Sequence, residues 1–178
     1  MEKGETRYMR IWFRLIIAMS AGLAPMVHAE AFKNEPAEFR GIEWGAPFAD
    51  HAQHLELVRE DNDVLVYLRS DEKAGSSQGS FMKIAYRFYK DRFSAGIIQT
   101  YGNDTKKKLR ESLIEEYGEP IRLSRRQELD AWDGEHVQIV LSCSVTSYCA
   151  AEFISKKMIA LEEQETGKPV QILQKDND

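Results

Sequence analysis

The sequence predicts an α+β fold in which an antiparallel sheet of about five or six strands packs one face on two helices. Residues 82–88 place apolar side chains at every second position, which is the period of a strand with one buried face. Residues 105–117 instead repeat their apolar side chains at helical spacing. Because neither a hairpin nor a helix can bury such a face alone, we expect these elements to cover each other.

The first 29 residues differ in composition from the rest of the chain. Basic side chains precede an apolar stretch at residues 15–23, and Val-His-Ala at residues 27–29 provides small residues before a cleavage point. These features predict a secretory signal peptide over residues 1–29. A membrane anchor is the alternative, but the uncharged stretch at 15–27 is shorter than the ~20 residues of a spanning helix.

Behind the signal peptide, the chain is expected to hold a flexible leader at 30–37, one domain at 38–165 and a frayed tail at 166–178. Cleavage would remove four basic and two acidic side chains, which lowers the net charge from −5 to −7. This acidic balance argues against nucleic-acid binding, which normally requires a basic patch. We therefore expect a periplasmic or secreted protein with no stable membrane span after cleavage.

Two cysteines occur in the sequence, Cys143 and Cys149. In an exported protein, an even pair at short spacing is most simply a disulfide. A metal site built on the two thiols would need further ligands, and the histidines of the domain are distant in sequence. The ring is short, so the restriction of the unfolded chain predicts about 2 kcal/mol of stabilisation.

The first part of the domain is predicted to contain two strands and a helix. Residues 38–45 form a short expected strand, and Pro47 suits the first turn of a helix. The apolar residues that follow recur at helical spacing, so we expect an amphipathic helix at 47–59. Residues 64–68 predict a strand, and the polar residues 69–79 predict a loop. The helical set is Phe48, Ala52, Leu55 and Val58.

Residues 81–101 predict the central hairpin, with Lys90 and Asp91 as its two turn residues. In this arrangement each apolar residue of the first strand meets a small or apolar residue of the second, which specifies the register. The expected pairs are Phe88 with Phe93, Tyr86 with Ala95, and Ile84 with Ile97.

The helix at 105–117 follows, with Gly118 as its C-terminal cap. Residues 121–132 predict a charged strand, and Asp-Gly-Glu at 133–135 is expected to form a three-residue loop. That loop makes Leu129 face Ile139 and Ala131 face Val137. A two-residue loop would instead place Asp130 opposite Val137.

A third hairpin is expected where Cys143 faces Cys149. The same register pairs Leu141 with Ala151 and Ile139 with Phe153, so the disulfide closes the hairpin beside its loop at residues 144–148. Val137 then shares one face with these inward residues of its strand. Ser155 is expected to cap a short helix at 156–165.

Candidate sites are few. His51 and His54 are weak candidates for metal ligands, since residues three apart can share a helical face, but they can equally be solvent-facing. His136 could act as an acid or base, yet no nucleophile partner is identifiable. Serines lack a G-x-S-x-G setting, and no glycine-rich phosphate loop occurs. The sequence therefore predicts neither a catalytic residue nor a cofactor.

Three aromatic residues near element ends, Trp44, Tyr101 and Trp132, are candidate contacts for a partner. The alternative is that Trp44 and Trp132 close the ends of the hydrophobic core.

Four stretches resemble small exported proteobacterial domains. They are F-x-G-I-x-W-G at 39–45, Y-x-F-Y-x-x-R-F at 86–93, Y-G-x-P at 117–120, and the strand pair from Trp132 onward. The pattern is more distantly similar to envelope modules of the SmpA/OmlA lipoprotein type and to β-lactamase-inhibitor-like proteins. This resemblance implies protein binding through a sheet or loop surface, but no functional residue can be carried over. The chain also lacks the lipid-attachment cysteine of the SmpA/OmlA type.

These observations predict a soluble periplasmic domain without catalysis, which binds another envelope protein or supports an assembly. One alternative is a periplasmic module that binds a small ligand or a metal. Another alternative is a hydrolase of unusual type.

Overall fold

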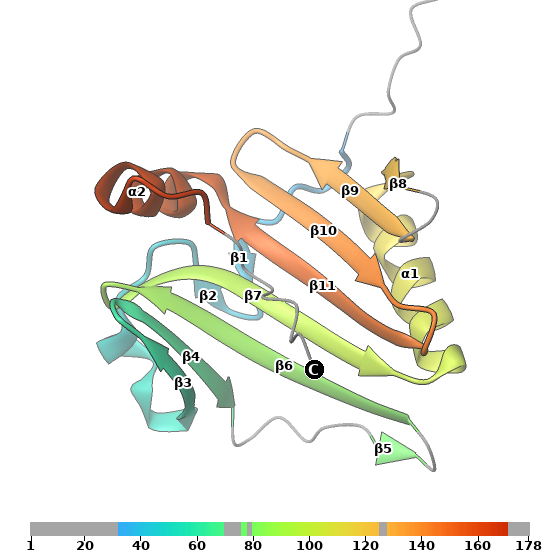
Figure 1. The fold of residues 1–178 in the computed structure, drawn as a ribbon, viewed down its shortest axis with the longest axis horizontal. Coiled ribbons are helices and arrows are strands. Elements are labelled where there is room, and N and C mark those ends of the chain that lie inside the picture. The colour runs from blue at the N-terminus through green and yellow to red at the C-terminus, as the bar shows by residue number, and fades with distance from the viewer. Residues whose placement is uncertain (1–31, 70–75, 78–79, 125–127, 171–178) are drawn as a thin grey trace, which may run out of the picture.

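The computed structural model describes residues 32–69, 76–77, 80–124 and 128–170. The described chain is mostly β, with a nine-stranded antiparallel sheet, a two-stranded sheet and two α-helices (Figure 1). The large sheet has the order β3-β4-β6-β7-β11-β10-β9-β8, and β5 pairs with β6. The strands are β1 Glu38–Phe39, β2 Ile42–Glu43, β3 Leu55–Asp61, β4 Val64–Arg69, β5 Ser76–Ser77, β6 Ser80–Tyr89, β7 Arg92–Tyr101, β8 Ile121–Ser124, β9 Leu129–Asp133, β10 Val137–Cys143 and β11 Tyr148–Ser155.

The predicted fold class, an α+β domain with five or six strands and both helices on one face, is wrong. Helix α1 (Asn103–Tyr117) packs Leu113 and Tyr117 into the large aromatic core on one face of the sheet. Helix α2 (Lys156–Thr166) brings Ile159 to a smaller cluster on the other face. In Figure 1, α1 lies behind the strands β9–β11, and α2 lies beyond the end of β11 at the upper left. Successive residues of a strand point to opposite faces of the sheet, and both faces are covered, so neighbouring residues in the central strands are both buried.

The predicted signal peptide at 1–29 lies outside the described residues, as do residues 171–178 of the predicted tail. Part of the expected leader makes contacts with the domain. Phe32 packs edge-on against Tyr117, with ring centroids 5.6 Å apart, and Lys33 N donates to the Tyr117 carbonyl at 3.0 Å. None of the described helices is long and apolar enough to cross a membrane.

The predicted helix at 47–59 is wrong. Two short 3-10 helices, Phe48–Asp50 and Ala52–His54, are followed by the edge strand β3. The apolar side chains at helical spacing serve a different purpose, since Phe48 stacks on Tyr67 of β4 with centroids 4.6 Å apart. Pairing of β3 with β4 satisfies backbone groups that a helix would have satisfied internally.

The strand predicted at 38–45 is split into β1 and β2 by Arg40 and Gly41, which both have positive φ. The strand predicted at 64–68 is confirmed as β4. The strand predicted at 121–132 is divided between β8 and β9.

The central hairpin forms with the predicted turn, but its register shifts after one pair. Lys90 and Asp91 have positive φ, and Phe88 faces Phe93 as expected. Beyond a bulge at Ser94, Tyr86 faces Gly96 rather than Ala95, so this part of the predicted register is wrong. Ile84 likewise faces Ile98 instead of Ile97.

The predicted loop between β9 and β10 is also wrong, because Ala131 faces Val140 and not Val137, and Leu129 faces Ser142 and not Ile139. The turn is wider than the predicted three-residue loop, because Asp133 faces Gln138. Gly134 N donates to the Val137 carbonyl at 2.9 Å within this turn. The third hairpin is confirmed: Cys143 faces Cys149 in a disulfide, Leu141 faces Ala151, and Ile139 faces Phe153.

Both predicted helices after the central hairpin are confirmed within a few residues. Gly118 is the C-terminal cap of α1, with φ of 87°. The Ser155 hydroxyl accepts from Met158 N at the start of α2.

Candidate functional site

The histidine pair is not on an α-helix. His51 and His54 lie in and between the short 3-10 helices that precede β3. Within the described ranges, no group of three or more His, Cys, Asp or Glu side chains is arranged to hold a metal ion.

The three aromatic candidates lie in different places. Trp132 is only 2% exposed and its indole N–H donates to the Gly118 carbonyl at 2.7 Å, so it belongs to the core. Tyr101 is 42% exposed at the end of β7. Trp44 is half-buried and stacks on Phe93 with ring centroids 5.2 Å apart, which leaves one side of the indole toward a surface groove.

This groove, which we call the Trp44 groove, lies between the leader, the residues after β2, the β9–β10 turn and the first half of α2. Its volume is about 910 Å³. Trp44 has a fixed orientation, since its indole N–H donates to the Pro36 carbonyl at 2.8 Å. Met158 and Leu161 contribute apolar surface from α2, and Leu161 is 40% exposed. The sequence candidates Trp44 and His136 both line this groove.

Glu35 anchors the leader at the wall of the Trp44 groove. Its carboxylate accepts the backbone N–H groups of Glu135, His136 and Val137. Partial burial opposes the ionisation of Glu35, but these three backbone donors outweigh it and hold the pKa of the carboxyl below its ordinary value. The contact also explains the wide turn, because three consecutive N–H groups must point at one carboxylate.

Basic side chains lie at the rim of the groove. Arg92 is exposed and donates to the Gly45 carbonyl at 3.2 Å. Lys156 forms an ion pair with Asp133 at 2.7 Å, and Lys157 is exposed. Glu35 keeps its negative charge, and Glu135 adds a second carboxylate to the lining of the groove.

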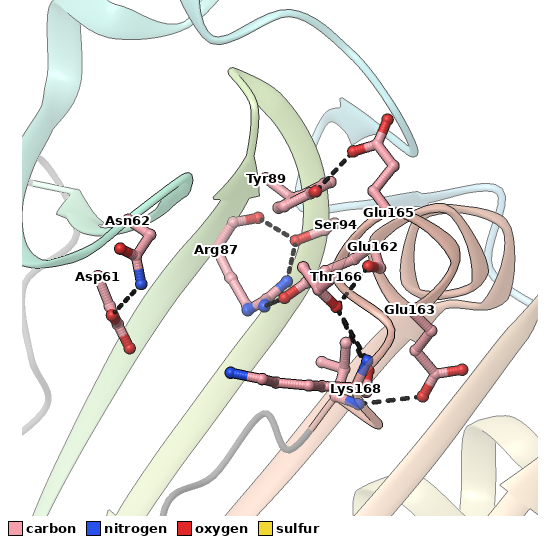
Figure 2. Close-up of polar contacts among 11 residues, drawn as sticks. Asp61, Asn62, Arg87, Tyr89, Ser94, Glu162, Glu163, Glu165, Thr166 and Lys168 are labelled. Atoms are coloured by element: carbon pink, nitrogen blue, oxygen red, sulfur yellow. Dashed lines mark hydrogen bonds and ion pairs between the residues drawn. The ribbon is translucent and has the colours of Figure 1, made fainter.

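The other side of α2 contains a buried polar cluster, the Arg87 cluster, made of Arg87, Ser94, Glu152 and Glu162. Arg87 on β6 is 4% exposed and Glu162 on α2 is 6% exposed. Arg87 Nη2 lies 2.6 Å from Glu162 Oε1, and Nη1 donates to Ser94 Oγ at 2.9 Å. Ser94 Oγ in turn donates to the Arg87 carbonyl at 3.0 Å (Figure 2). The bulge therefore supplies the hydroxyl that helps to hold the guanidinium.

Glu152 on β11 is the second carboxyl of the Arg87 cluster, and it is 7% exposed. Burial raises the pKa of Glu152 to about 7, although the nearby Arg87 guanidinium favours the charged form. Glu152 can therefore change its charge near neutral pH.

The end of α2 is also tied to the central hairpin. Tyr89 Oη donates to Glu165 Oε2 at 2.6 Å, and Lys90 Nζ lies 2.7 Å from the same oxygen. Hydrogen bonds from Lys90 and Tyr89 lower the pKa of Glu165, and the contact with Glu165 raises the pKa of Lys90. These contacts and the Arg87–Glu162 pair fix α2 on the sheet.

A cavity of about 330 Å³ opens beside the Arg87 cluster. Arg87, Tyr89 and Glu162 lie at its inner end. The turn between β3 and β4 forms one wall, and the residues that follow α2 form another (Figure 2).

Sequence reasoning did not identify the Arg87 cluster. Arg87 occupies a polar position of an alternating strand, and such positions normally face solvent. Ala85, two residues before Arg87 and on the same face of β6, could have indicated the cluster. A small residue on a face that is expected to meet solvent allows a helix to approach closely.

Comparisons with protein-family models, with curated proteins and with solved structures find no match to this chain.

Proposed function

We propose that the protein is an exported, non-catalytic binding domain that holds an extended segment of another envelope protein in the Trp44 groove. The observation that carries this proposal is the combination of an oriented, half-buried tryptophan with exposed apolar surface from α2. Fixed aromatic side chains in partly desolvated grooves are typical anchors of protein interfaces.

The charge of the rim favours a partner segment with both apolar and acidic residues. Arg92 and Lys157 are exposed at the rim, in a chain whose net charge is −5. The lining of the groove holds three basic side chains, Arg92, Lys156 and Lys157, against two carboxylates, Glu35 and Glu135. This excess of positive charge around an apolar floor would orient such a segment and speed its association. The apolar anchor of the partner would lie against Trp44 and Leu161.

Export is supported by the signal-peptide pattern at 1–29 and by the disulfide between Cys143 and Cys149, since such bonds persist in oxidising compartments. A non-catalytic role is supported by the surroundings of His136. Its side chain is exposed, and the nearest ionic partner is Glu135 at 4.0 Å. A general base normally needs a positioned partner within hydrogen-bond distance.

Site-specific photocrosslinking in intact cells tests the proposal. A photoreactive phenylalanine analogue at Leu161 should give one discrete adduct with an envelope protein, whereas the same analogue at the exposed Glu115 of α1 should not. The substitution Lys157→Glu should weaken the Leu161 adduct several-fold, because it reverses a charge of the rim. The matched control Lys108→Glu reverses an exposed charge on α1 and should leave the adduct unchanged. Equal adducts from positions 161 and 115, or none from 161, would contradict the proposal.

A further inference from the structure

Glu162, which lines the cavity beside the Arg87 cluster, has a carboxylate oxygen without a hydrogen-bond donor in the described part of the chain. Glu162 Oε1 is paired with Arg87, but Oε2 is buried and accepts no hydrogen bond from the described part of the chain. Glu162 lines the cavity, and its side chain is 8% exposed. A buried, unpaired carboxylate oxygen is costly, so a donor that enters the cavity would be bound favourably.

The walls of the cavity contain charges of both signs. Arg59 and Asp61 lie on β3, Asp63 lies in the β3–β4 turn, and Lys168 follows α2. These four side chains are exposed at the mouth, and Figure 2 shows Lys168 extending from the end of α2 toward the Asp61 side. A simple cation would meet Arg59, Arg87 and Lys168, and a simple anion would meet the carboxylates.

We propose that this cavity binds a small zwitterion of the amino-acid class, with its ammonium group toward the Glu162 carboxylate at the inner end and its carboxylate toward Arg59 and Lys168. An ammonium group supplies the missing donor at the buried end. Lysine and arginine side chains at the mouth are suitable donors to a carboxylate. The volume of about 330 Å³ lies at the small end of ligand sites, which suits a ligand of this size.

This site is separate from the Trp44 groove, because the two lie on different sides of α2 and share no lining residue. Binding at one can therefore be measured without the other, and failure of either proposal leaves the other intact.

The proposal is tested by titrating the purified full chain with each standard L-amino acid, monitored by calorimetry and by NMR of the backbone amides. At least one amino acid should bind and perturb the amides of the β3–β4 turn and of residues 166–170. The matched probes are the amine and the carboxylic acid made by deleting one charged group from the best ligand. Each should bind roughly tenfold or more weakly, since each loses a charge-assisted hydrogen bond.

Variants separate the two charged ends. Lys168→Gln and Arg59→Gln change exposed side chains and should weaken binding of the amino acid. The amine should bind at least as tightly to these variants as to the unaltered protein, because each substitution removes a positive charge that opposes a simple cation. Glu162→Gln should weaken both the amino acid and the amine. Lys107→Gln, on α1, is the control and should change neither. The proposal is overturned if no amino acid binds, if the amine binds as tightly as the amino acid, or if the Lys168 and Arg59 variants bind the amino acid unchanged.

Discussion

The two faces of the large sheet are packed by different means. On the α1 face, Phe93 is fully buried among Phe39, Tyr86 and Phe88, with ring centroids 6.3, 6.1 and 5.4 Å away. On the α2 face, the same strand contributes Ala95, which is also fully buried. Large rings fill the space between the sheet and α1, whereas small side chains let α2 approach and leave room for the Arg87 cluster.

The buried charges of the two faces differ as well. On the α1 face, Asp130 is 2% exposed, and Arg110 Nε and Arg122 Nη2 donate to its Oδ2 at 3.0 and 3.2 Å. Arg122 also forms an ion pair with Oδ1, so each oxygen of this carboxylate has a cationic neighbour. On the α2 face, Arg87 pairs with Glu162 Oε1. One oxygen on each face, Asp130 Oδ1 and Glu162 Oε2, is buried without a hydrogen bond from the described part of the chain. Two arginines hold the buried carboxylate on the α1 face, whereas Arg87 holds the one on the α2 face.

The largest expected effect is the loss of a ring on the α1 face. Phe93→Ala should lower the free energy of unfolding by about 3–5 kcal/mol, because it removes a fully buried ring and leaves a cavity. Ile159→Ala, which truncates a partly buried residue on α2, should cost only about 1–2 kcal/mol. Urea unfolding of both variants measures the difference. Equal losses would show that the two faces contribute alike.

The second effect concerns the buried ion pair. Arg87→Met should cost about 3 kcal/mol, because it leaves the Glu162 carboxylate buried without its partner. The double variant Arg87→Met with Glu162→Leu should recover most of that loss, since two apolar side chains of similar size need no pairing. Denaturation of both variants gives the comparison. A double variant no more stable than Arg87→Met would contradict this explanation.

The third effect depends on pH. The pKa of Glu152 is raised to about 7 in the folded protein from an ordinary value of 4.5. Its contribution to stability is therefore fully present below the ordinary value and is lost as the pH rises through 7. The loss should be about 3 kcal/mol. Glu152→Gln should reduce this decline between pH 5 and 8, as measured by unfolding at a series of pH values. An unchanged pH profile in that variant would exclude Glu152 as the cause.

The sequence predicted those parts of the sheet in which local pattern and pairing agree. The β10–β11 register follows from alternation, because a shift by one residue would expose Ile139 and Leu141. The alternating pattern could not reveal the bulge at Ser94. The extra residue in β7 is held by a hydrogen bond from the Arg87 side chain of β6, and such a contact leaves no trace in the alternation. Nor could spacing distinguish a helix at 47–59 from short 3-10 helices and an edge strand, because the outcome depends on pairing with β4.

The candidate sites were less predictable than the strands. Trp44 was recognised as an aromatic residue near an element end, but the groove beside it depends on α2, which is distant in sequence. Glu35 was assigned to a flexible leader, and its contact with the β9–β10 turn joins residues about a hundred positions apart. Arg87 and Glu162 are likewise separated by 75 positions. Long-range polar contacts of this kind leave no periodic signal in one sequence.

The smallest expected effect compares how the two helices begin. At α2 the Ser155 hydroxyl accepts from Met158 N, whereas α1 begins after Gly102 without a side-chain cap. Ser155→Ala should therefore cost about 1 kcal/mol. Lys107→Ala near the start of α1 should change stability by less than about 0.5 kcal/mol, because its pair with Glu111 is exposed and 3.7 Å apart. Thermal unfolding of both variants would resolve these values, and a larger loss for Lys107→Ala would mean that α1 depends on surface charge rather than on its packing against the aromatic core.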